Sequence, residues 1–440
     1  MRAVGRSTGT QQLPRVRPGR ASHARPIRRA GLALAVLACT LAFFALTQAN
    51  GQGGAALADG IRAVAGPVAA AQVEGGYLAV RDGARRALYQ LGIGRPTAPW
   101  APPTKVAGPA NGLPAASGTA SGPPPAASAA ATPRATAATT TSSTSAAAGS
   151  AASAPQPTVA PPGAIAPIVS PALPGEGQWS VVTPGPTPGQ PLVSKTFWRP
   201  DPVRPYALVT LLAFNPQGTR LRMVAGTSQP GGPLGNGGPG IIPAADQQPG
   251  VLLAAFNGGF KEANGAFGMM VNGKVYVPPV AGSGTIAVTR QGQVLMGLWG
   301  SDPALSSANT DLVAWRQNGP LLINQGAITS LTDNIAAWGQ TIGGAYTWRS
   351  GIGLTANGTL LYAAGDALSA RTLAGALRAA GAVTALQLDI NPFWVRAFTY
   401  SPAPGGGLAI DKLQSTMYGT GHEYLRGDSR DFFYVTRHQP

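Results

Sequence analysis

The sequence predicts an α+β fold: a single C-terminal globular domain of β-rich mixed sheets with a few helices. From Glu176 onward, short apolar and β-branched runs alternate with turn signals, as in strands joined by tight connections. The stretch Thr372–Ala380 has the apolar spacing of a helix and leads directly into the apolar run Val383–Ile390, which predicts a further strand. The chain before residue 176 lacks this alternation, so we expect the domain to span residues 176–440.

Local signals place the individual elements of this domain. Asn-Gly pairs tolerate positive φ at both turn positions and predict hairpins at Asn272-Gly273 and Asn357-Gly358, with a weaker signal at Gln291-Gly292. Ser369 or Thr372 can cap the helix, and Gly381 ends it. The remaining predicted strands are Tyr206–Phe214, Leu221–Ala225, Val251–Phe256, Thr285–Thr289 and Val313–Trp315.

The N-terminal segment predicts attachment to a membrane. Residues 1–29 contain eight of the 32 basic residues and no acid, and residues 30–49 form an uncharged apolar run. A run of about 20 such residues is long enough to cross a bilayer as a helix. The positive-inside rule then places the tail in the cytoplasm and the C-terminal domain outside it, in a single-pass protein of the cell membrane. The alternative is a signal peptide cleaved near Ala56–Ala58, which leaves the domain secreted.

Two segments separate this anchor from the domain. In residues 50–95, a small juxtamembrane segment, several apolar residues at helical spacing predict a short surface helix. They are Val80, Ala84, Ala87, Leu88 and Leu91. Residues 96–175 consist mainly of Pro, Ala, Ser, Thr and Gly. Such a segment buries too little apolar surface to offset the entropy that is lost when the chain becomes ordered. We expect a disordered linker that spans on the order of 200 Å when it is stretched.

Charge and composition exclude several function classes. The net charge is +16, but from Glu176 onward there are 17 basic and 13 acidic residues, without a basic run that has interleaved aromatics. We therefore expect no nucleic-acid partner. One cysteine and three histidines leave too few ligands for an internal disulfide or a His/Cys zinc site. We expect no metal and no cofactor, while a cation site of Asp and Asn side chains stays open.

Three stretches suit chemistry better than plain packing. After an apolar run, Asn257-Gly258-Gly259-Phe260-Lys261 combines an amide, two glycines that allow close backbone approach, and a cation. The loop could equally need its glycines for the turn alone. Arg349 lies at the edge of a predicted strand, where a buried guanidinium needs an anionic partner, either Asp389, Asp366 or a substrate phosphate or carboxylate.

The third stretch places a carboxylate and an amide, Asp389 and Asn391, at the end of the apolar run Val383–Ile390. Strand ends are common ligand sites in layered α/β structures, which favours a functional role. The alternative is that Asp389 caps a turn before Pro392.

These stretches, in this order, resemble the phosphodiester glycosidase family, whose animal member removes N-acetylglucosamine from a phosphodiester on lysosomal enzymes. The resemblance covers about Tyr206 to Val435. Its motifs are Asn257-Gly258-Gly259-Phe260, Val271-Asn272-Gly273, Asn318-Gly319-Pro320-Leu321-Leu322, Arg349-Ser350-Gly351-Ile352-Gly353 and Leu388-Asp389. One departure concerns the residues after the Asp: the family continues with glycines and a serine, whereas this chain has Ile390-Asn391-Pro392-Phe393-Trp394. Such a loop wraps a phosphate less freely with backbone N–H groups.

The resemblance implies an envelope-anchored hydrolase that cleaves a sugar-1-phosphodiester in a cell-wall or exopolysaccharide-type substrate. Because the phosphate leaving group is a weak base, we expect its stabilisation by Arg349, assisted by Lys261, to matter more than acid catalysis. Asp389 attacks, or activates water at, the oxocarbenium-like centre. Asn257 and Asn391 hold sugar hydroxyls or orient Asp389, with Asp366, or else Glu262, as a second carboxylate. The catalytic set is then Asp389, Arg349 and Asn257, and the substrate-binding set is Gly258, Gly259, Lys261, Asn318, Asp366 and Asn391.

Two other functions also fit the sequence. A tethered domain could hold an envelope glycan or other phosphodiester-containing polymer without cutting it, as a binding or scaffolding module. The altered loop after Asp389 and the scarcity of histidines favour that alternative. An envelope assembly factor with protein partners is the third, with Trp198, Trp299 and Trp394 as candidate interface residues, although core packing is the commoner fate of a tryptophan.

Overall fold

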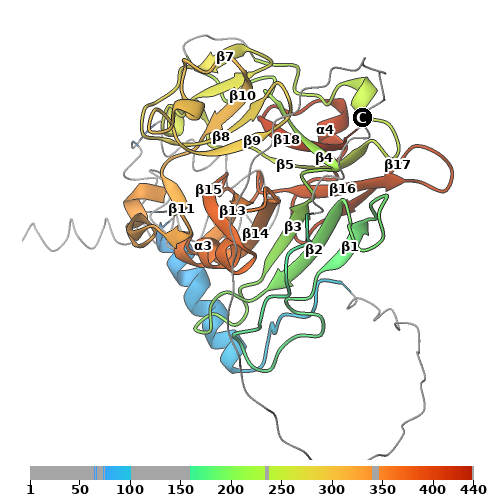
Figure 1. The fold of residues 1–440 in the computed structure, drawn as a ribbon. Helices are drawn as coiled ribbons and strands as arrows, with labels where there is room; N and C mark the ends of the chain where they lie inside the picture. The colour runs from blue at the N-terminus through green and yellow to red at the C-terminus, as the bar shows by residue number, and fades with distance from the viewer. Residues whose placement is uncertain are drawn as a thin grey trace, which may run out of the picture.

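Three β-sheets form the framework of the chain that the computed structural model describes, namely residues 64, 66, 73, 75–100, 159–232, 237–338 and 346–438 (Figure 1). With only a few helices beside them, they confirm the β-rich α+β class. The predicted tail (1–29) and anchor (30–49) and most of the predicted linker (96–175) lie outside the described residues. No helix in the described part is both long and apolar enough to span a bilayer.

The largest sheet has eight strands, and the other two have five each. In spatial order, the eight are β1 (Ser180–Thr183), β2 (Val193–Trp198), β3 (Val209–Phe214), β14 (Leu360–Leu368), β13 (Thr347–Thr355), β15 (Ala382–Gln387), β11 (Leu321–Asn324) and β12 (Ala327–Ile328). The second sheet runs β7 (Lys274–Val277), β6 (Met269–Val271), β10 (Leu312–Gln317), β8 (Gly284–Thr289) and β9 (Val294–Leu298). The third runs β17 (Leu408–Lys412), β16 (Ala397–Pro402), β5 (Leu252–Asn257), β18 (Phe432–Arg437) and β4 (Thr219–Val224).

All pairs of these strands are antiparallel, so the prediction of mixed sheets is wrong. A parallel pair needs a long crossover between its strands, whereas many strands here follow one another through tight turns. The three predicted hairpin turns are confirmed: they join β6 to β7, β8 to β9 and β13 to β14. At the first, Asn272 and Gly273 have φ of 50° and 75°, as a turn with positive φ at both positions requires.

One helix, α3 (Ala370–Ala379), covers a face of the eight-stranded sheet (Figure 1). The predicted cap is confirmed, because the Ser369 side chain accepts from the N–H of Thr372. Its buried face carries Leu373 and Leu377, and Gly381 follows it with φ of 98°. The opposite face of this sheet packs on the two five-stranded sheets through a shared core that includes Phe214, Phe256 and Tyr362.

The other helical turns are short. They are α4 (Glu423–Arg426) and the 3-10 turns η1 (Ala244–Asp246), η2 (Glu262–Asn264), η3 (Pro303–Leu305), η4 (Ser330–Asp333) and η5 (Ile335–Trp338). Strand β15 ends at Gln387, three residues before the predicted end at Ile390. The chain leaves the sheet there because the Asp389 side chain accepts from the N–H groups of Ile390 and Asn391, which forms a turn.

A helix over residues 75–90 confirms the predicted helix in the juxtamembrane segment, but a different face is buried. Tyr77, Leu78 and Asp82 are buried, whereas Val80, Leu88 and Leu91 are exposed. Ion pairs with the domain determine which face of this helix is buried. Arg204 donates to both carboxylate oxygens of Asp82, each at 2.9 Å. Arg81 and Arg85 both pair with Asp366 in β14. Charged contacts with the domain, which the apolar spacing does not reveal, therefore orient this helix.

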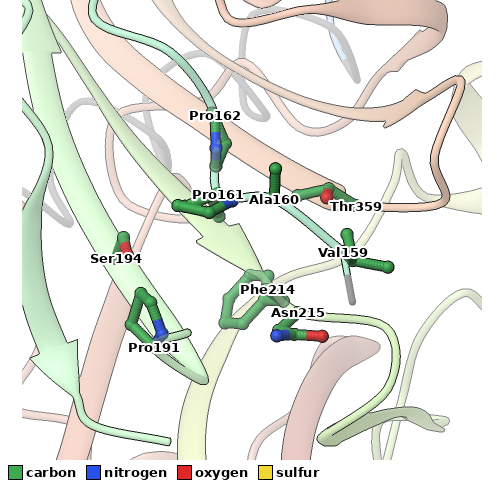
Figure 2. A pocket seen from close by; sticks show the side chains of 10 residues that line it. Val159, Ala160, Pro161, Pro162, Pro191, Ser194, Phe214, Asn215 and Thr359 are labelled. Atoms are coloured by element: carbon green, nitrogen blue, oxygen red, sulfur yellow. The ribbon is translucent and has the colours of Figure 1, made fainter. Parts of the chain in front are cut away.

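A short extended segment, residues 159–162, lies against the ends of β2, β3 and β14 (Figure 2). Between Pro161, Pro191 and Phe214 it encloses a cavity of about 10 Å³. That is room for roughly one water molecule, so this pocket is too small for a sugar.

Candidate active site

A double-glycine turn, Gly258-Gly259, lies at the end of β5 and is held on both sides. The N–H of Gly258 donates to the carbonyl of Asp431 (3.0 Å), and its carbonyl accepts from the N–H of Asp389 (3.1 Å). A Cβ added at Gly258 would lie 2.1 Å from Asp431 Oδ2, and one at Gly259 would lie 2.8 Å from Asn318 Oδ1. The two glycines are therefore needed because the segments of Asp431 and Asn318 approach the backbone closely at this point.

The Asn257 side chain, buried before this turn, connects several strands. Its Nδ2 donates to Ser350 Oγ and to the carbonyl of Gly258, both at 2.9 Å. Its Oδ1 accepts from the Tyr362 hydroxyl (2.8 Å) and from the N–H of Arg396 (3.3 Å). These contacts use most of the hydrogen-bonding capacity of the amide, which suits a positioning residue.

Asp389 lies two residues beyond β15 and is 4% exposed. Its Oδ1 accepts from the N–H groups of Ile390 (2.8 Å) and Asn391 (2.9 Å), and its Oδ2 pairs with Arg430. Its carbonyl accepts from Ser350 Oγ (2.8 Å), so Ser350 joins Asp389 to Asn257. The structure thus brings together two of the three predicted catalytic residues, Asn257 and Asp389.

A set of buried arginine–aspartate pairs surrounds this cluster, and sequence reasoning did not identify it. The pairs are Arg430 with Asp389, Arg316 with Asp431 (2.9 Å) and Arg396 with Asp428. Burying a charge is costly unless it is paired and hydrogen-bonded, so each of these side chains fixes the position of its partner. The available signal was the charged run Asp428-Ser429-Arg430-Asp431 placed directly before the apolar strand β18.

Asn318 also lies in this cluster, where it was predicted. Its Oδ1 accepts from the N–H of Phe260 (2.8 Å), and its Nδ2 donates to the carbonyls of Gln387 (2.7 Å) and Leu388 (3.2 Å). It therefore links the segment after the double-glycine turn to the segment that carries Asp389.

Trp394 covers two arginines of the cluster. The guanidinium carbons of Arg396 and Arg430 each lie 5.0 Å from the centroid of its ring, within the range of a cation–π contact. The Nε atoms of both arginines are buried and have no hydrogen-bond partner among the described residues. Burial acts to lower the pKa of Arg396, but Tyr424 and Asp428 outweigh it and raise that pKa above its ordinary value. These two N–H groups are available to an anion that reaches them.

Arg349, the third predicted catalytic residue, points away from the cluster. Successive side chains of a strand face opposite sides, and Ser350 faces Asn257. Arg349 instead donates to the carbonyl of Leu368 (2.9 Å) and to Gln387 Oε1 (2.6 Å). Burial lowers its pKa to about 10. Of the anionic partners considered for Arg349, Asp389 pairs with Arg430, and Asp366 pairs with Arg81 and Arg85. The third alternative, a substrate phosphate or carboxylate, stays a prediction.

The remaining predicted residues divide between the cluster and other places. Asp366 binds the helix over residues 75–90, so the structure does not bring it to Asp389 as a second carboxylate. Lys261 is half-buried just after Phe260, directly before η2. Asn391 Oδ1 accepts from the N–H of Phe393 (3.0 Å) and shapes the loop beneath Trp394. Glu262 begins η2 and is half-buried.

The tryptophans considered for a protein interface are mostly internal. Trp198 and Trp299 are each 6% exposed, and Trp394 packs on the two arginines described above. Trp198 and Trp299 therefore follow the core-packing alternative. Among the described residues, no group of three or more His, Cys, Asp or Glu side chains is placed to hold a metal ion.

Residues 251–389 match the model of the phosphodiester glycosidase family. The predicted resemblance is confirmed over that range. The match begins just before β5 and ends at Asp389, so it includes Asn257, the double-glycine turn and Asn318. Arg430 and Asp431 lie beyond its end.

The solved structures that match this chain are distant from it in sequence. The catalytic domain of zebrafish N-acetylglucosamine-1-phosphodiester alpha-N-acetylglucosaminidase, auto-inhibited by its pro-peptide, is 13% identical, with 60% of this chain and 88% of that chain covered and a TM-score of 0.36. A hypothetical protein from Synechocystis is 16% identical, with 53% and 59% covered and a TM-score of 0.28. A protein from Burkholderia pseudomallei, described as exported, is 10% identical, with 52% and 74% covered and a TM-score of 0.24. No curated protein sequence matches this chain.

Proposed function

We propose that the domain is a hydrolase that cleaves the bond between the anomeric carbon of a sugar and the oxygen of a phosphodiester. The phosphodiester glycosidase match over residues 251–389 supports this class of reaction. The observation that carries the proposal is the Asp389 carboxylate, held by Arg430 and two backbone N–H groups beside the double-glycine turn. Such a fixed carboxylate next to cations is the arrangement that this reaction needs.

Asp389 supplies the carboxylate that attacks the anomeric carbon or activates a water molecule at that centre. A carboxylate has about four acceptor positions, and the contacts with Ile390, Asn391 and Arg430 occupy three of them. One position on Oδ2 is left for the reacting atom or water. Asn257 and Ser350 hold the segment that carries Asp389 and thereby fix its direction.

The leaving group is a phosphate monoester, which needs stabilisation of its negative charge more than it needs a proton. Arg430 takes the role first expected of Arg349, because its guanidinium lies at Asp389 and its Nε has no partner among the described residues. Arg396 supplies a second such N–H. The half-buried Lys261, which follows Phe260, supplies a further cation. Arg349 acts at a distance by fixing Gln387, the last residue of β15.

The test uses the full-length protein and a synthetic sugar 1-(4-nitrophenyl phosphate) diester, with release of 4-nitrophenyl phosphate as the signal. Asp389→Asn is expected to lower turnover by orders of magnitude with unchanged circular dichroism. The matched control is Asp333→Asn, which removes an exposed aspartate paired with Arg371 and should turn over normally. Full activity of Asp389→Asn would remove this carboxylate from the mechanism.

A non-catalytic glycan-binding or scaffolding module is the second candidate. The burial of Asp389, at 4% exposure, and the Pro-Phe-Trp loop over its neighbours favour it. Binding of purified envelope glycan without release of sugar or phosphate, by wild type and Asp389→Asn alike, would support the module instead of the hydrolase.

We also propose that the protein is anchored in the cell membrane by residues 30–49, with the domain outside the cytoplasm and its substrate in the envelope. The apolar run and the basic tail before it support this proposal. Mass spectrometry of the mature N-terminus, together with protease treatment of intact cells, tests it. A mature chain that begins after residue 49 would replace the anchored form with a secreted one.

A further inference from the structure

A groove lies between the two five-stranded sheets, away from the double-glycine turn. It encloses about 860 Å³ and is lined by β4 and the end of β18 on one side, and by the β6–β7 and β8–β9 hairpins on the other. A second cavity of about 690 Å³ adjoins it, and both are lined by Arg222, Asn272 and Arg290. Asp431, which contacts Gly258, precedes β18, whereas Arg437 ends it, a separation of about 20 Å along an extended strand. The groove is therefore distinct from the site around Asp389.

The lining of this groove is strongly basic. Its cationic residues are Arg220, Arg222, Lys274, Arg290 and Arg437, and its one acidic residue is Asp246. The Tyr434 hydroxyl donates to Asp246 Oδ2 at 2.7 Å. Arg290 also pairs with Asp311, outside the lining, at 3.7 Å, so four of the cations face one acidic residue. The domain from Glu176 onward has 17 basic and 13 acidic residues, a smaller excess.

Two of these arginines are held next to each other. Arg220 and Arg222 lie two residues apart on the same face of β4, at a spacing of roughly 7 Å. Arg220 also reaches the opposite hairpin, because a Cβ added at Gly292 would lie 2.6 Å from its Cδ. Burial and the charge of Arg222 lower the pKa of Arg220. Arg222 is exposed and makes no hydrogen bond or ion pair with the described residues. An external anion would therefore best reduce the repulsion between the guanidinium groups of Arg220 and Arg222.

The neutral residues of the groove suit a sugar chain. Amides and hydroxyls come from Asn272, Gln291 and Thr436, and the adjoining cavity adds Ser306, Ser307, Asn309 and Thr310. The tryptophans at the second cavity, Trp299 and Trp315, are 6% and 3% exposed, so neither presents a ring face on which a nucleobase could stack. Two adjoining cavities in series fit a polymer better than a single small anion.

We propose that this groove binds an anionic glycan, a polymer with phosphate or carboxylate groups at intervals along a sugar or polyol chain. The arginines of β4 and the β8–β9 hairpin bind the charges, and the amides and hydroxyls bind the units between them. This inference does not depend on hydrolysis at Asp389. The groove would hold the protein on the envelope polymer whether or not the polymer is cut.

The test measures binding of the full-length protein to two immobilised anionic probes, polygalacturonate and poly(glycerol phosphate), with dextran as the neutral probe. Wild type is expected to bind an anionic probe, more weakly as salt rises, and to leave dextran unbound. Arg222→Gln/Arg290→Gln should lower the affinity at least tenfold. The matched control, Arg371→Gln/Arg378→Gln, removes the same charge from the exposed side of α3 and should change the affinity less than twofold.

The two anionic probes show whether carboxylate or phosphate is preferred, and binding of either supports the proposal. An equal loss in both double variants would mean that binding follows net charge and not the groove, which overturns it. So would failure to bind both anionic probes, or tighter binding of a single-stranded DNA oligomer than of either. Melting temperatures of all variants, compared with wild type, separate loss of binding from loss of fold.

Discussion

Arg430 Nη2 donates to the carboxylate of Asp389 and to the carbonyl of Gly259 (3.0 Å), so one guanidinium joins the end of β15 to the turn after β5. Asp389 and Arg430 lie 41 positions apart in the chain, and the family match ends at Asp389. This pairing fixes the direction of the Asp389 carboxylate and, in the proposed mechanism, supplies the cation for a leaving phosphate.

Arg430→Lys is expected to lower turnover by about 10²- to 10³-fold, the usual cost of losing a fixed donor at a developing negative charge. Lysine keeps the positive charge, so Asp389 is not left unpaired in the interior. Its ammonium lacks the fixed planar geometry with which Arg430 Nη2 reaches both Asp389 and Gly259. Steady-state kinetics on the sugar phosphodiester, with a thermal melt of each sample, make the measurement. Unchanged turnover would show that the Arg430 donors take no part in the reaction.

Arg349→Gln is expected to behave differently, because Arg349 faces α3 and the Leu368 carbonyl instead of the Asp389 cluster. We expect a lower melting temperature, since its buried hydrogen bonds to Leu368 and Gln387 are lost, and a smaller effect on turnover than that of Arg430→Lys. If Arg349→Gln has the larger effect on turnover at a temperature where both are folded, Arg349 and not Arg430 supports the reaction.

Gly258→Ala is expected to destabilise the domain by about 1–3 kcal/mol, because the new Cβ would lie 2.1 Å from Asp431 Oδ2. Gly375→Ala in α3 is the matched control: nothing lies within 4 Å of its Cβ position, and alanine should stabilise the helix by about 0.5–1 kcal/mol. Urea unfolding of both variants compares them. Equal stabilities would mean that the turn relaxes easily and does not need its glycines.

The contact between the helix over residues 75–90 and the domain should weaken in acid. Burial acts to raise the pKa of Asp82, but hydrogen bonds from Arg204 and Tyr206 outweigh it and lower that pKa below its ordinary value. A carboxyl whose pKa is lower in the folded state than in the unfolded state stabilises the contact in full at a pH above the unfolded pKa, which is about 3.9 for Asp. That contribution is lost as the pH falls through the pKa of the folded state. The contact should therefore be intact at neutral pH and loosen below about pH 4.

Amide hydrogen exchange of residues 75–90, corrected for the intrinsic rate at each pH, measures this effect. Asp82→Asn is the control: it should expose these amides already at pH 7, at a cost of about 1–3 kcal/mol to the contact, and remove most of the dependence on acid. Protection that falls equally with pH in wild type and Asp82→Asn would assign the acid sensitivity to other groups.

Local signals in the sequence were sufficient for much of the fold. The Asn272-Gly273 turn and the Ser369 cap depend on φ preferences and hydrogen bonds within a few residues, and both are where they were predicted. The end of β15 was placed too late, because apolar character continues to Ile390 while the Asp389 side chain already turns the chain. On the helix over residues 75–90, apolar spacing selected the exposed face, since partners far along the chain decide which face is buried.

The candidate site was predictable only in part for the same reason. Asn257, the two glycines and Asp389 belong to motifs that can be recognised in the sequence. Arg430 and Asp431 contact these residues from a segment about 170 residues after the double-glycine turn. No local sequence pattern relates that segment to the turn. Arg349 was assigned to the site from its motif, and the alternation of side chains along β13 places it on the opposite face.

Hydrolysis in water enriched in oxygen-18 tests the central claim most directly, because it locates the broken bond. With a sugar 1-phosphodiester as substrate, attack at the anomeric carbon places the label in the released sugar and leaves the phosphate monoester unlabelled. We expect this result for wild type and a loss of the labelled sugar with Asp389→Asn. A label found in the phosphate would mean that a phosphorus–oxygen bond is cleaved, which would contradict a glycosidase mechanism at Asp389.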